Sequence, residues 1–227
     1  MKKIWHISDT HGYHELLNIP DGIDIVIHSG DASNSRDPYN NEPEMRKFID
    51  WYKNVNIKYK VYVAGNHDTS IEKGLVTKKD FEDAGIIYIE NEYVDVYGVK
   101  IFGSPHTPNF GNWAFMRDRV KLDRFWRKAI DEPCDIIVTH GPPKGILDKS
   151  YDRNGKMEMC GDKSLLNRIA EINPELVLFG HIHNTEDIVN AGIMQTSNYK
   201  TIYSNGSVVT DNKFGKLTSN GNILWRS

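Results

Sequence analysis

Five short polar runs follow apolar stretches of strand length in this chain, and together they limit its fold and its chemistry. The runs cover residues 8–12, 29–31, 65–68, 139–143 and 180–184. They offer two carboxylates, one amide oxygen and four imidazoles as metal ligands, with His67 left over for chemistry. Because open α/β sheets place their sites just beyond the carboxyl ends of strands, we expect these groups to converge. One such run alone could be a plain turn, but five in succession indicate a two-metal centre.

Spacing within two of the runs suggests how ligands share an ion. Asp9 and His11 are two residues apart, and so are His181 and His183. In extended chain, residues two apart project to the same side. We therefore expect each pair to be able to reach a single ion.

The other runs suggest a division of labour. Asn66 and His67 are neighbours, so their side chains should point in different directions, which favours Asn66 for metal and His67 for the substrate. Asp31 follows an apolar stretch and the breaker formed by Ser29 and Gly30. A carboxylate has enough lone pairs to bridge two ions, which makes Asp31 the candidate shared ligand.

Apolar runs of strand length recur along the chain and alternate with a few helical patterns. The predicted strands cover residues 3–8, 23–29, 58–64, 86–89, 94–102 (a hairpin), 135–139, 176–179, 193–196, 201–204 and 223–226. Helical spacing occurs over residues 43–53, 120–130 and 163–172. This mixture predicts an α/β fold in which helices flank two mixed β-sheets, a four-layer αββα sandwich.

No linker rich in Pro or Gly interrupts the sequence, so we expect a single domain over residues 1–227. Breakers cluster in residues 104–111 and 150–161, which are predicted to be surface loops around a site.

Bulk composition excludes several classes of protein. The formal net charge is −3 and there is no basic run, so we expect no extended surface for duplex nucleic acid. The apolar stretch near the N-terminus is short and Asp9 interrupts it, so we expect neither a signal peptide nor a membrane span. Cys134 and Cys160 are the only cysteines, which argues against a disulfide framework. These features predict a cytoplasmic protein and leave its oligomeric state open.

The chain resembles the calcineurin-like metallophosphoesterases in its full set of motifs, which are Asp9-x-His11, Gly30-Asp31, Gly65-Asn66-His67-Asp68, His140-Gly141 and Gly180-His181-x-His183. Within that family it is most similar to the branch of metallophosphoesterase-domain-containing phosphodiesterases, over most of residues 1–210. Two positions depart from this branch. Asp68 stands where Glu is common, and His106 stands where an aromatic residue is expected. Neither is a candidate metal ligand, so the departures bear on substrate preference.

The resemblance implies a dinuclear metal centre. One ion would be held by Asp9, His11, Asp31 and His183. The second would be held by Asp31, Asn66, His140 and His181. Mixed nitrogen and oxygen ligands suit Mn, Fe, Zn, Co or Ni better than Mg or Ca, and we expect Mn to serve best in vitro.

The mechanism that follows is hydrolysis of a phosphoester. Two ions roughly 3.5–4 Å apart would activate a bridging hydroxide for in-line attack on phosphorus. His67, aimed away from metal, would protonate the leaving alkoxide or bind a phosphoryl oxygen, and Asp68 would orient it. His28 is expected to support a metal ligand from behind.

We predict that the substrate is a small phosphodiester, including a cyclic nucleotide. The loops over residues 104–111 and 144–160 are expected to form the pocket for its second ester group. The candidate contacts are His106, Asn109, Phe110, Trp113 and Lys144, and a flat aromatic ring there could stack on a nucleobase. Phe110 and Trp113 could instead only cover the core.

Three other functions compete with this one. The same centre would serve a phosphomonoesterase, including a protein phosphatase, or a nuclease acting on short single-stranded ends. A catalytically silent scaffold that binds proteins should have lost His67 or one of the ligands, and none is missing. The expected partner is therefore a small phosphoester, with no duplex nucleic acid and no membrane.

Overall fold

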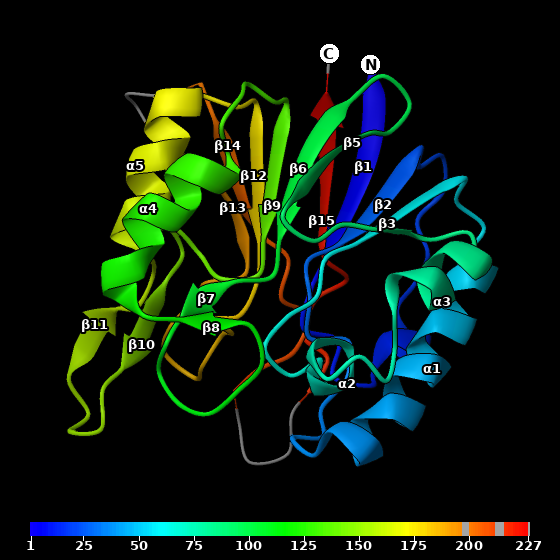
Figure 1. Ribbon diagram of the computed structural model, residues 1–227, viewed down its shortest axis with the longest axis horizontal. Helices are drawn as coiled ribbons and strands as arrows, with labels where there is room; N and C mark the ends of the chain where they lie inside the picture. The colour runs from blue at the N-terminus through cyan, green and yellow to red at the C-terminus, as the bar shows by residue number, and fades with distance from the viewer. Residues whose placement is uncertain (197–199, 212–215, 227) are drawn as a thin grey trace.

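Two mixed β-sheets face each other in the structure (Figure 1), a computed structural model that describes residues 1–196, 200–211 and 216–226. The strands of the first sheet are β1 (Lys2–Ile7), β2 (Ile25–His28), β3 (Tyr59–Tyr62), β4 (Ile87–Tyr88) and β15 (Asn222–Arg226). Their order is β15-β1-β2-β3-β4, and every pair is parallel except β15 with β1.

The second sheet is also parallel at its centre and antiparallel at its edges. Its strands are β5 (Glu92–Asp95), β6 (Lys100–Ser104), β9 (Ile136–Thr139), β12 (Leu176–Phe179), β13 (Gly192–Gln195) and β14 (Ile202–Asn205). Their order is β13-β14-β12-β9-β6-β5. The four central strands run parallel, while β5 and β13 pair antiparallel with their neighbours.

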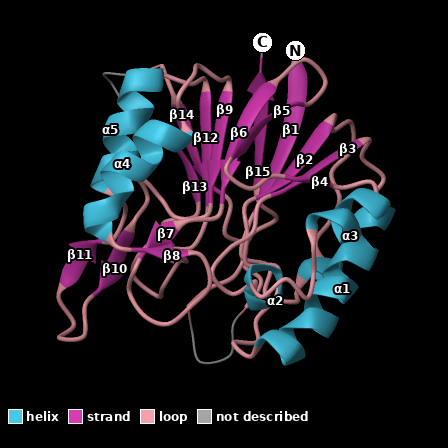
Figure 2. Cartoon of the chain, viewed as in Figure 1, coloured by secondary structure: helices cyan, strands magenta, loops and turns pink. Residues whose placement is uncertain are grey.

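Helices cover the outer side of each sheet (Figure 2). On the side of the first sheet lie α1 (Pro38–Asn54), α2 (Thr69–Glu72) and α3 (Lys78–Asp83). On the side of the second lie α4 (Arg119–Ala129) and α5 (Lys163–Ile172). The predicted αββα sandwich is confirmed.

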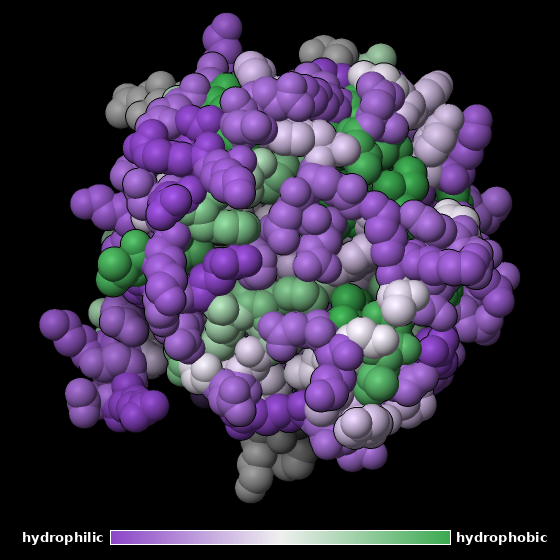
Figure 3. All heavy atoms as spheres, viewed as in Figure 1, coloured by the Kyte–Doolittle hydropathy of each residue, from purple (hydrophilic) through white to green (hydrophobic). Residues whose placement is uncertain are grey.

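Three buried apolar clusters hold these four layers together. One lies between the sheets, and the other two lie between each sheet and its helices. In β2, Ile25 and Ile27 belong to the cluster between the sheets, whereas Val26 packs on the helix side. Alternate residues thus face opposite layers, and a strand buried on both faces is apolar throughout. Hydrophilic side chains cover most of the face shown in Figure 3.

Several element boundaries differ from the prediction. α1 begins at Pro38 rather than at residue 43, because the Asp37 side chain caps it by accepting from the backbone N atoms of Tyr39 and Asn40. The loop predicted over 150–161 holds parts of a small hairpin, β10 (Lys149–Tyr151) and β11 (Met157–Met159). The loop over 104–111 holds β7 (Thr107–Pro108), which pairs with β8 (Met116–Arg117). A single 3₁₀ turn, His14–Leu16, follows the first polar run.

The parallel strands of both sheets end on one side of the molecule. In Figure 1 this is the lower side, where α2, the β7–β8 pair and the β10–β11 hairpin also lie, and the two chain termini are at the opposite side. The polar runs that follow β1, β2, β3, β9 and β12 therefore meet at the lower side. In the described part of the chain, no helix combines the length and apolar character needed to cross a membrane.

Candidate metal centre

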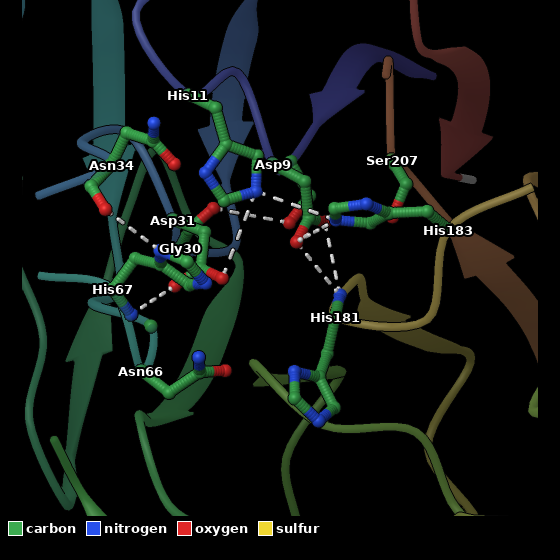
Figure 4. Close-up of polar contacts among 12 residues, drawn as sticks. Asp9, His11, Gly30, Asp31, Asn34, Asn66, His67, His181, His183 and Ser207 are labelled. Atoms are coloured by element: carbon green, nitrogen blue, oxygen red, sulfur yellow. Dashed lines mark hydrogen bonds and ion pairs between the residues drawn. The ribbon is translucent and has the colours of Figure 1, made fainter. Parts of the chain in front are cut away.

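The seven candidate ligands come together where strands of both sheets end (Figure 4). They are Asp9 and His11 after β1, Asp31 after β2, Asn66 after β3, His140 after β9, and His181 and His183 after β12. A parallel bridge between Ser8 and Ser207 joins the two sheets at this point, with Ser8 N donating to Gly206 O at 2.8 Å. The site is thus built across the junction of the two sheets.

A first cluster contains Asp9, His11 and His183, whose potential ligand atoms lie within 4.8 Å of one another. His183 Nε2 is 3.1 Å from Asp9 Oδ1 and 3.4 Å from His11 Nε2. On their far sides, His11 Nδ1 faces the Ser33 carbonyl oxygen at 3.1 Å, and His183 Nδ1 faces Asp211 Oδ1 at 2.7 Å. Both Nδ1 atoms face acceptors and so carry hydrogen, which directs the Nε2 lone pair of each neutral ring into the cluster.

A second cluster contains Asp31, His140 and His181. His140 Nε2 lies 3.2 Å from Asp31 Oδ2 and 3.0 Å from Asn66 Oδ1. His140 Nδ1 donates to the Ser29 carbonyl oxygen at 2.9 Å, so Nε2 is the ring nitrogen that faces these two oxygens and that can offer a lone pair to metal once it loses its proton.

Asp31 lies between the two clusters. Its Oδ2 is 3.9 Å from His11 Nε2 in the first cluster and 3.2 Å from His140 Nε2 in the second. Lone pairs of nitrogen and oxygen that converge in this way repel one another unless a positive charge lies among them. This mixed donor set fits divalent transition-metal ions, and Asp31 is placed to serve two of them.

The backbone of the site is held in an unusual conformation. Four candidate ligands have positive φ angles: 53° for Asp9, 41° for His11, 58° for Asp31 and 69° for His181. Such angles are uncommon for residues with a Cβ and cost about 1–3 kcal/mol each. Gly30, with φ at 105°, allows the loop after β2 to approach Gly65 and His140 closely, because a Cβ there would lie 2.6 Å from both Gly65 N and His140 Nδ1. Strain concentrated on ligating groups is typical of a functional site.

Burial and charge move the pKa values of the imidazoles in opposite directions. Burial lowers the pKa of His11 to about 4 and, with the nearby His140, that of His181 to about 3. Burial also acts against the charged forms of His140 and His183, but neighbouring carboxylates outweigh it. The pKa of His140 is raised to about 9 and that of His183 to about 10. In the metal-free protein these two rings are therefore protonated, and their positive charges offset the negative charges of Asp9 and Asp31.

Metal uptake is therefore expected to release about two protons near neutral pH, one from His140 and one from His183. Both pKa values are raised above 6.5, so the rings stay protonated until the pH passes about 9 to 10, and the apparent metal affinity should rise with pH up to that range. The stability that these protonated rings give the metal-free protein should be fully present below about pH 6.5 and lost as the pH rises through about 9 to 10. Titration calorimetry with Mn²⁺ in buffers of different ionisation enthalpy measures the proton count. Release of no protons would contradict the prediction.

His67 lies at the edge of the ligand group, between His11 and Asn66 in the view of Figure 4. Its backbone N donates to Asp31 Oδ1 at 2.7 Å, and its ring Nδ1 faces the Asn34 carbonyl oxygen at 3.1 Å. Nε2 is thus the ring nitrogen that can face a substrate.

Asp68 was predicted to orient His67, but its side chain points elsewhere. Its buried carboxylate accepts five hydrogen bonds, from the backbone N atoms of Asp31, Ser33 and Gly65 and from the hydroxyls of Ser33 and Tyr62. The carboxylate therefore braces the loops after β2 and β3, while the Asn34 carbonyl holds the His67 ring.

Removing this brace should destabilise the fold. We expect Asp68→Ala to lower the free energy of unfolding of the metal-free protein by about 3–5 kcal/mol, because several buried donors lose their acceptor. Urea denaturation measures the change. Asp83→Ala, at an exposed carboxylate paired with Lys79, is the matched control and should change stability by less than about 0.5 kcal/mol. A loss below about 1 kcal/mol in Asp68→Ala would show that the brace is dispensable.

A cavity of about 450 Å³ adjoins the second cluster, and His181 and Asp211 form part of its wall. Phe110, which is 54% exposed, also lines it, with its ring centroid 5.1 Å from that of His181. Arg119 at the start of α4 and Tyr151 at the end of β10 are further lining residues. The cavity thus opens beside the candidate metal centre.

Of the predicted substrate contacts, Phe110 lines this cavity. The ring nitrogens of His106 are both engaged within the protein. Nδ1 donates to the Phe115 carbonyl oxygen at 2.9 Å, and Nε2 accepts from Arg117 Nη2 at 3.1 Å. Asn109 Oδ1 accepts from Gly111 N, which stabilises its own turn, and Lys144 is exposed outside the cavity wall.

Sequence reasoning missed some groups that hold the ligands in place. Ser207 Oγ donates to Asp9 Oδ2 at 2.7 Å, and Asp211 holds His183. Both follow β14 without a metal-binding spacing, so no sequence signal marks them. His28 lies behind two ligand runs, where its Nδ1 accepts from Gly30 N at 3.2 Å and its Nε2 lies 3.1 Å from Thr10 Oγ1.

The αββα sandwich gathers Asp, Asn and His side chains at its strand ends in an arrangement that can hold metal ions. Residues 2–185 match the family described as calcineurin-like phosphoesterase. The chain belongs to this family. The predicted resemblance is confirmed.

Known proteins resemble this chain in sequence or in fold. The chain is 32% identical to Metallophosphoesterase domain-containing protein 1 of Homo sapiens over 231 residues, which cover 91% of this chain. It spans 66% of that relative's length, just under two thirds. A solved structure superposes with a TM-score of 0.63 at 17% identity, covering 90% of each chain. The protein TT1561 of Thermus thermophilus gives 0.60 at 16% identity, covering 90% of this chain and 88% of the other. These two structures support the fold alone.

Proposed function

We propose that this chain is a dinuclear phosphodiesterase, carried on a single domain, that hydrolyses small phosphodiesters of the nucleotide type. The observation that carries the proposal is that Asp31, a member of the second cluster, also lies 3.9 Å from His11 Nε2 of the first and so links the two clusters. Asp9, His11, Asp31 and His183 would hold one ion. Asp31, Asn66, His140 and His181 would hold the second. When bound, the two ions would supply an activated water and positive charge at the phosphoryl group.

The protein's own side chains would position the reacting groups. His67, the candidate general acid, is tied to Asp31 because its backbone N donates to Asp31 Oδ1 at 2.7 Å. With Nδ1 held by the Asn34 carbonyl oxygen, His67 Nε2 would give its proton to the leaving oxygen or hold a phosphoryl oxygen. Asp211 and the Ser29 carbonyl oxygen fix the rings of His183 and His140, so that each presents Nε2 inward.

The adjoining cavity supports a diester over a monoester, because a diester has a second ester group that needs room. The exposed ring of Phe110 and the ring of Tyr151 offer flat surfaces on which a nucleobase could stack. Arg119 and Arg153 bring positive charge to a wall that also carries the carboxylates of Asp152, Glu158 and Asp211. The Arg119 guanidinium is fixed by donating to the carbonyl oxygens of Gly161 and Cys160 at 3.0 and 2.7 Å. A singly charged nucleotide diester matches this combination.

The test is a screen of the Mn²⁺-reconstituted protein over cyclic nucleotides, linear dinucleotides and nucleoside monophosphates. We expect kcat/KM for the best diester to exceed that for the monoester of the same base by at least about tenfold. A preference for monoesters would favour the phosphomonoesterase. Turnover restricted to oligonucleotide ends would favour the nuclease. Turnover of none of these substrates, with no bound metal, would favour the scaffold.

Phe110→Ala tests the cavity in the same screen. Loss of a stacking surface worth about 1–3 kcal/mol should raise KM for nucleotide diesters by about 5- to 150-fold. Tyr97→Ala is the control, because Tyr97 is also half-exposed but lies between β5 and β6, away from the strand ends that carry the site. Equal KM values in wild type and Phe110→Ala would remove the nucleobase from the proposal.

A further inference from the structure

Three neighbours fix the ring of His67. The Asn34 carbonyl oxygen holds Nδ1 at 3.1 Å, and the His11 ring meets it edge-on, with centroids 4.7 Å apart and planes at 79°. The third neighbour is Trp113, whose ring centroid is 4.1 Å away with planes inclined by 32°. This is the shortest centroid distance of any described ring pair around the site, and it brings the two ring faces together. A large flat ring in that position limits rotation of the imidazole.

Trp113 is itself held by hydrogen bonds on both sides of it in the chain. Before it, the Asn112 carbonyl oxygen accepts from Arg36 Nε and Nη2 at 3.1 and 2.7 Å. After it, Ala114 N donates to the Asn66 carbonyl oxygen at 3.1 Å, which ties this segment to the run that carries His67. The Arg36 guanidinium also lies 4.7 Å over the Trp113 ring, within the range of a cation–π contact.

We infer that Trp113 is a positioning residue that holds His67 with Nε2 directed at the leaving oxygen of the substrate. The inference rests on the proposed function. In the step concerned, the bond from phosphorus to the leaving oxygen breaks while a water oxygen bonds to phosphorus. In this step the doubly protonated His67 ring gives its Nε2 proton to the leaving oxygen and keeps the Nδ1 hydrogen on the Asn34 carbonyl oxygen. The proton lost by water returns to Nε2 through solvent. A ring that is free to rotate would deliver this proton less often.

A leaving-group series separates positioning from simple packing. A nucleoside alkoxide needs a proton in order to leave, whereas 4-nitrophenolate leaves without one. We expect Trp113→Ala to lower kcat for the alkoxide ester by about 10- to 100-fold and kcat for the 4-nitrophenyl ester by no more than about threefold. Trp113→Phe, which keeps a flat ring, should restore most of the loss. Trp225→Ala, at a 55% exposed Trp on the edge strand β15, should change neither rate.

A second readout needs neither metal nor turnover. Ring currents of Trp113 at 4.1 Å should shift the His67 ring protons upfield in the NMR spectrum of the metal-free protein. Trp113→Ala should abolish this shift, and Trp113→Phe should retain part of it. Unchanged His67 ring-proton shifts in Trp113→Ala would overturn the inference directly, even if the protein were inactive on every diester.

His67→Ala in the same series distinguishes the inference from the proposed function on which it rests. If His67→Ala shows the leaving-group dependence and Trp113→Ala loses activity equally on both esters, the inference is overturned and the proposed function stands. If His67→Ala shows no such dependence, the acid role of His67 is wrong and the inference is overturned with it. Equal metal content in all variants, measured by plasma emission spectroscopy, ensures that these rates report on His67.

Discussion

Asp31→Asn is expected to lower kcat by at least about 10³-fold and to remove at least one metal ion from the reconstituted protein. Asp31 Oδ2 is the oxygen placed between the clusters, 3.9 Å from His11 Nε2 and 3.2 Å from His140 Nε2. Asparagine has the same shape but carries no charge, and it exchanges one oxygen for an NH₂ group. The variant therefore loses the charge that would be shared by both ions, while the loop keeps its size.

The measurement combines kcat on the best substrate of the screen with metal analysis after gel filtration. Asp83→Asn is the matched control, because it makes the same chemical change at an exposed carboxylate paired with Lys79, and it should keep full activity and both ions. Wild-type turnover with two bound ions in Asp31→Asn would refute the shared-ligand role. Loss of both ions together would indicate that the two clusters form one cooperative site.

Much of the fold could be predicted because burial on both faces of a strand leaves a clear mark in the sequence. The run 176–179 is wholly apolar, and its residues divide between the cluster that separates the sheets and the cluster under α4 and α5. The bounds of α5 agree with the prediction because local signals stop it at both ends: Asp162 caps its start, and Asn173, with φ at 54°, ends it. By contrast, α3 has six residues with only Phe81 buried, which is too short for helical periodicity to show.

The candidate ligands stand out in the sequence but the groups that hold them in place do not, for a physical reason. A metal ligand must be one of a few residue types at a strand end, so its identity is written in the sequence. The groups that orient the imidazoles include the carbonyl oxygens of Ser29, Ser33 and Asn34. Every residue has a carbonyl, and only the fold decides which one faces a ring.

The side chains of Asp68 and His106 are both held inside the protein, for the same reason. Asp68 follows His67 in sequence, which suggested contact, but its carboxylate turns inward to backbone donors in loops far away along the chain. His106 lies in a loop beside the site, yet a carbonyl and Arg117 hold its ring inside the protein. Sequence proximity places a residue near a site without giving the direction of its side chain.

His67→Ala is expected to lower kcat for an alkoxide leaving group by about 10²- to 10⁴-fold while the protein keeps both metal ions. The prediction separates two roles that the geometry allows. The potential ligand atoms of His67, His11 and Asp31 lie within 4.8 Å of one another, which is close enough for the three residues to share a metal ion. Against that role, the six residues of the two ligand clusters and Asn66 already supply seven donors without it.

Metal analysis of His67→Ala and His67→Asn therefore decides the assignment. Asparagine keeps a polar group that can donate to the Asn34 carbonyl oxygen but cannot act as a proton donor of comparable acidity. If His67 is the acid, both variants should hold two ions and lose turnover on the alkoxide ester, with a much smaller loss on the 4-nitrophenyl ester. If it is a ligand, His67→Ala should lose metal and lose activity equally on both esters. The second result would move His67 into the metal centre and leave the leaving oxygen to be protonated by water.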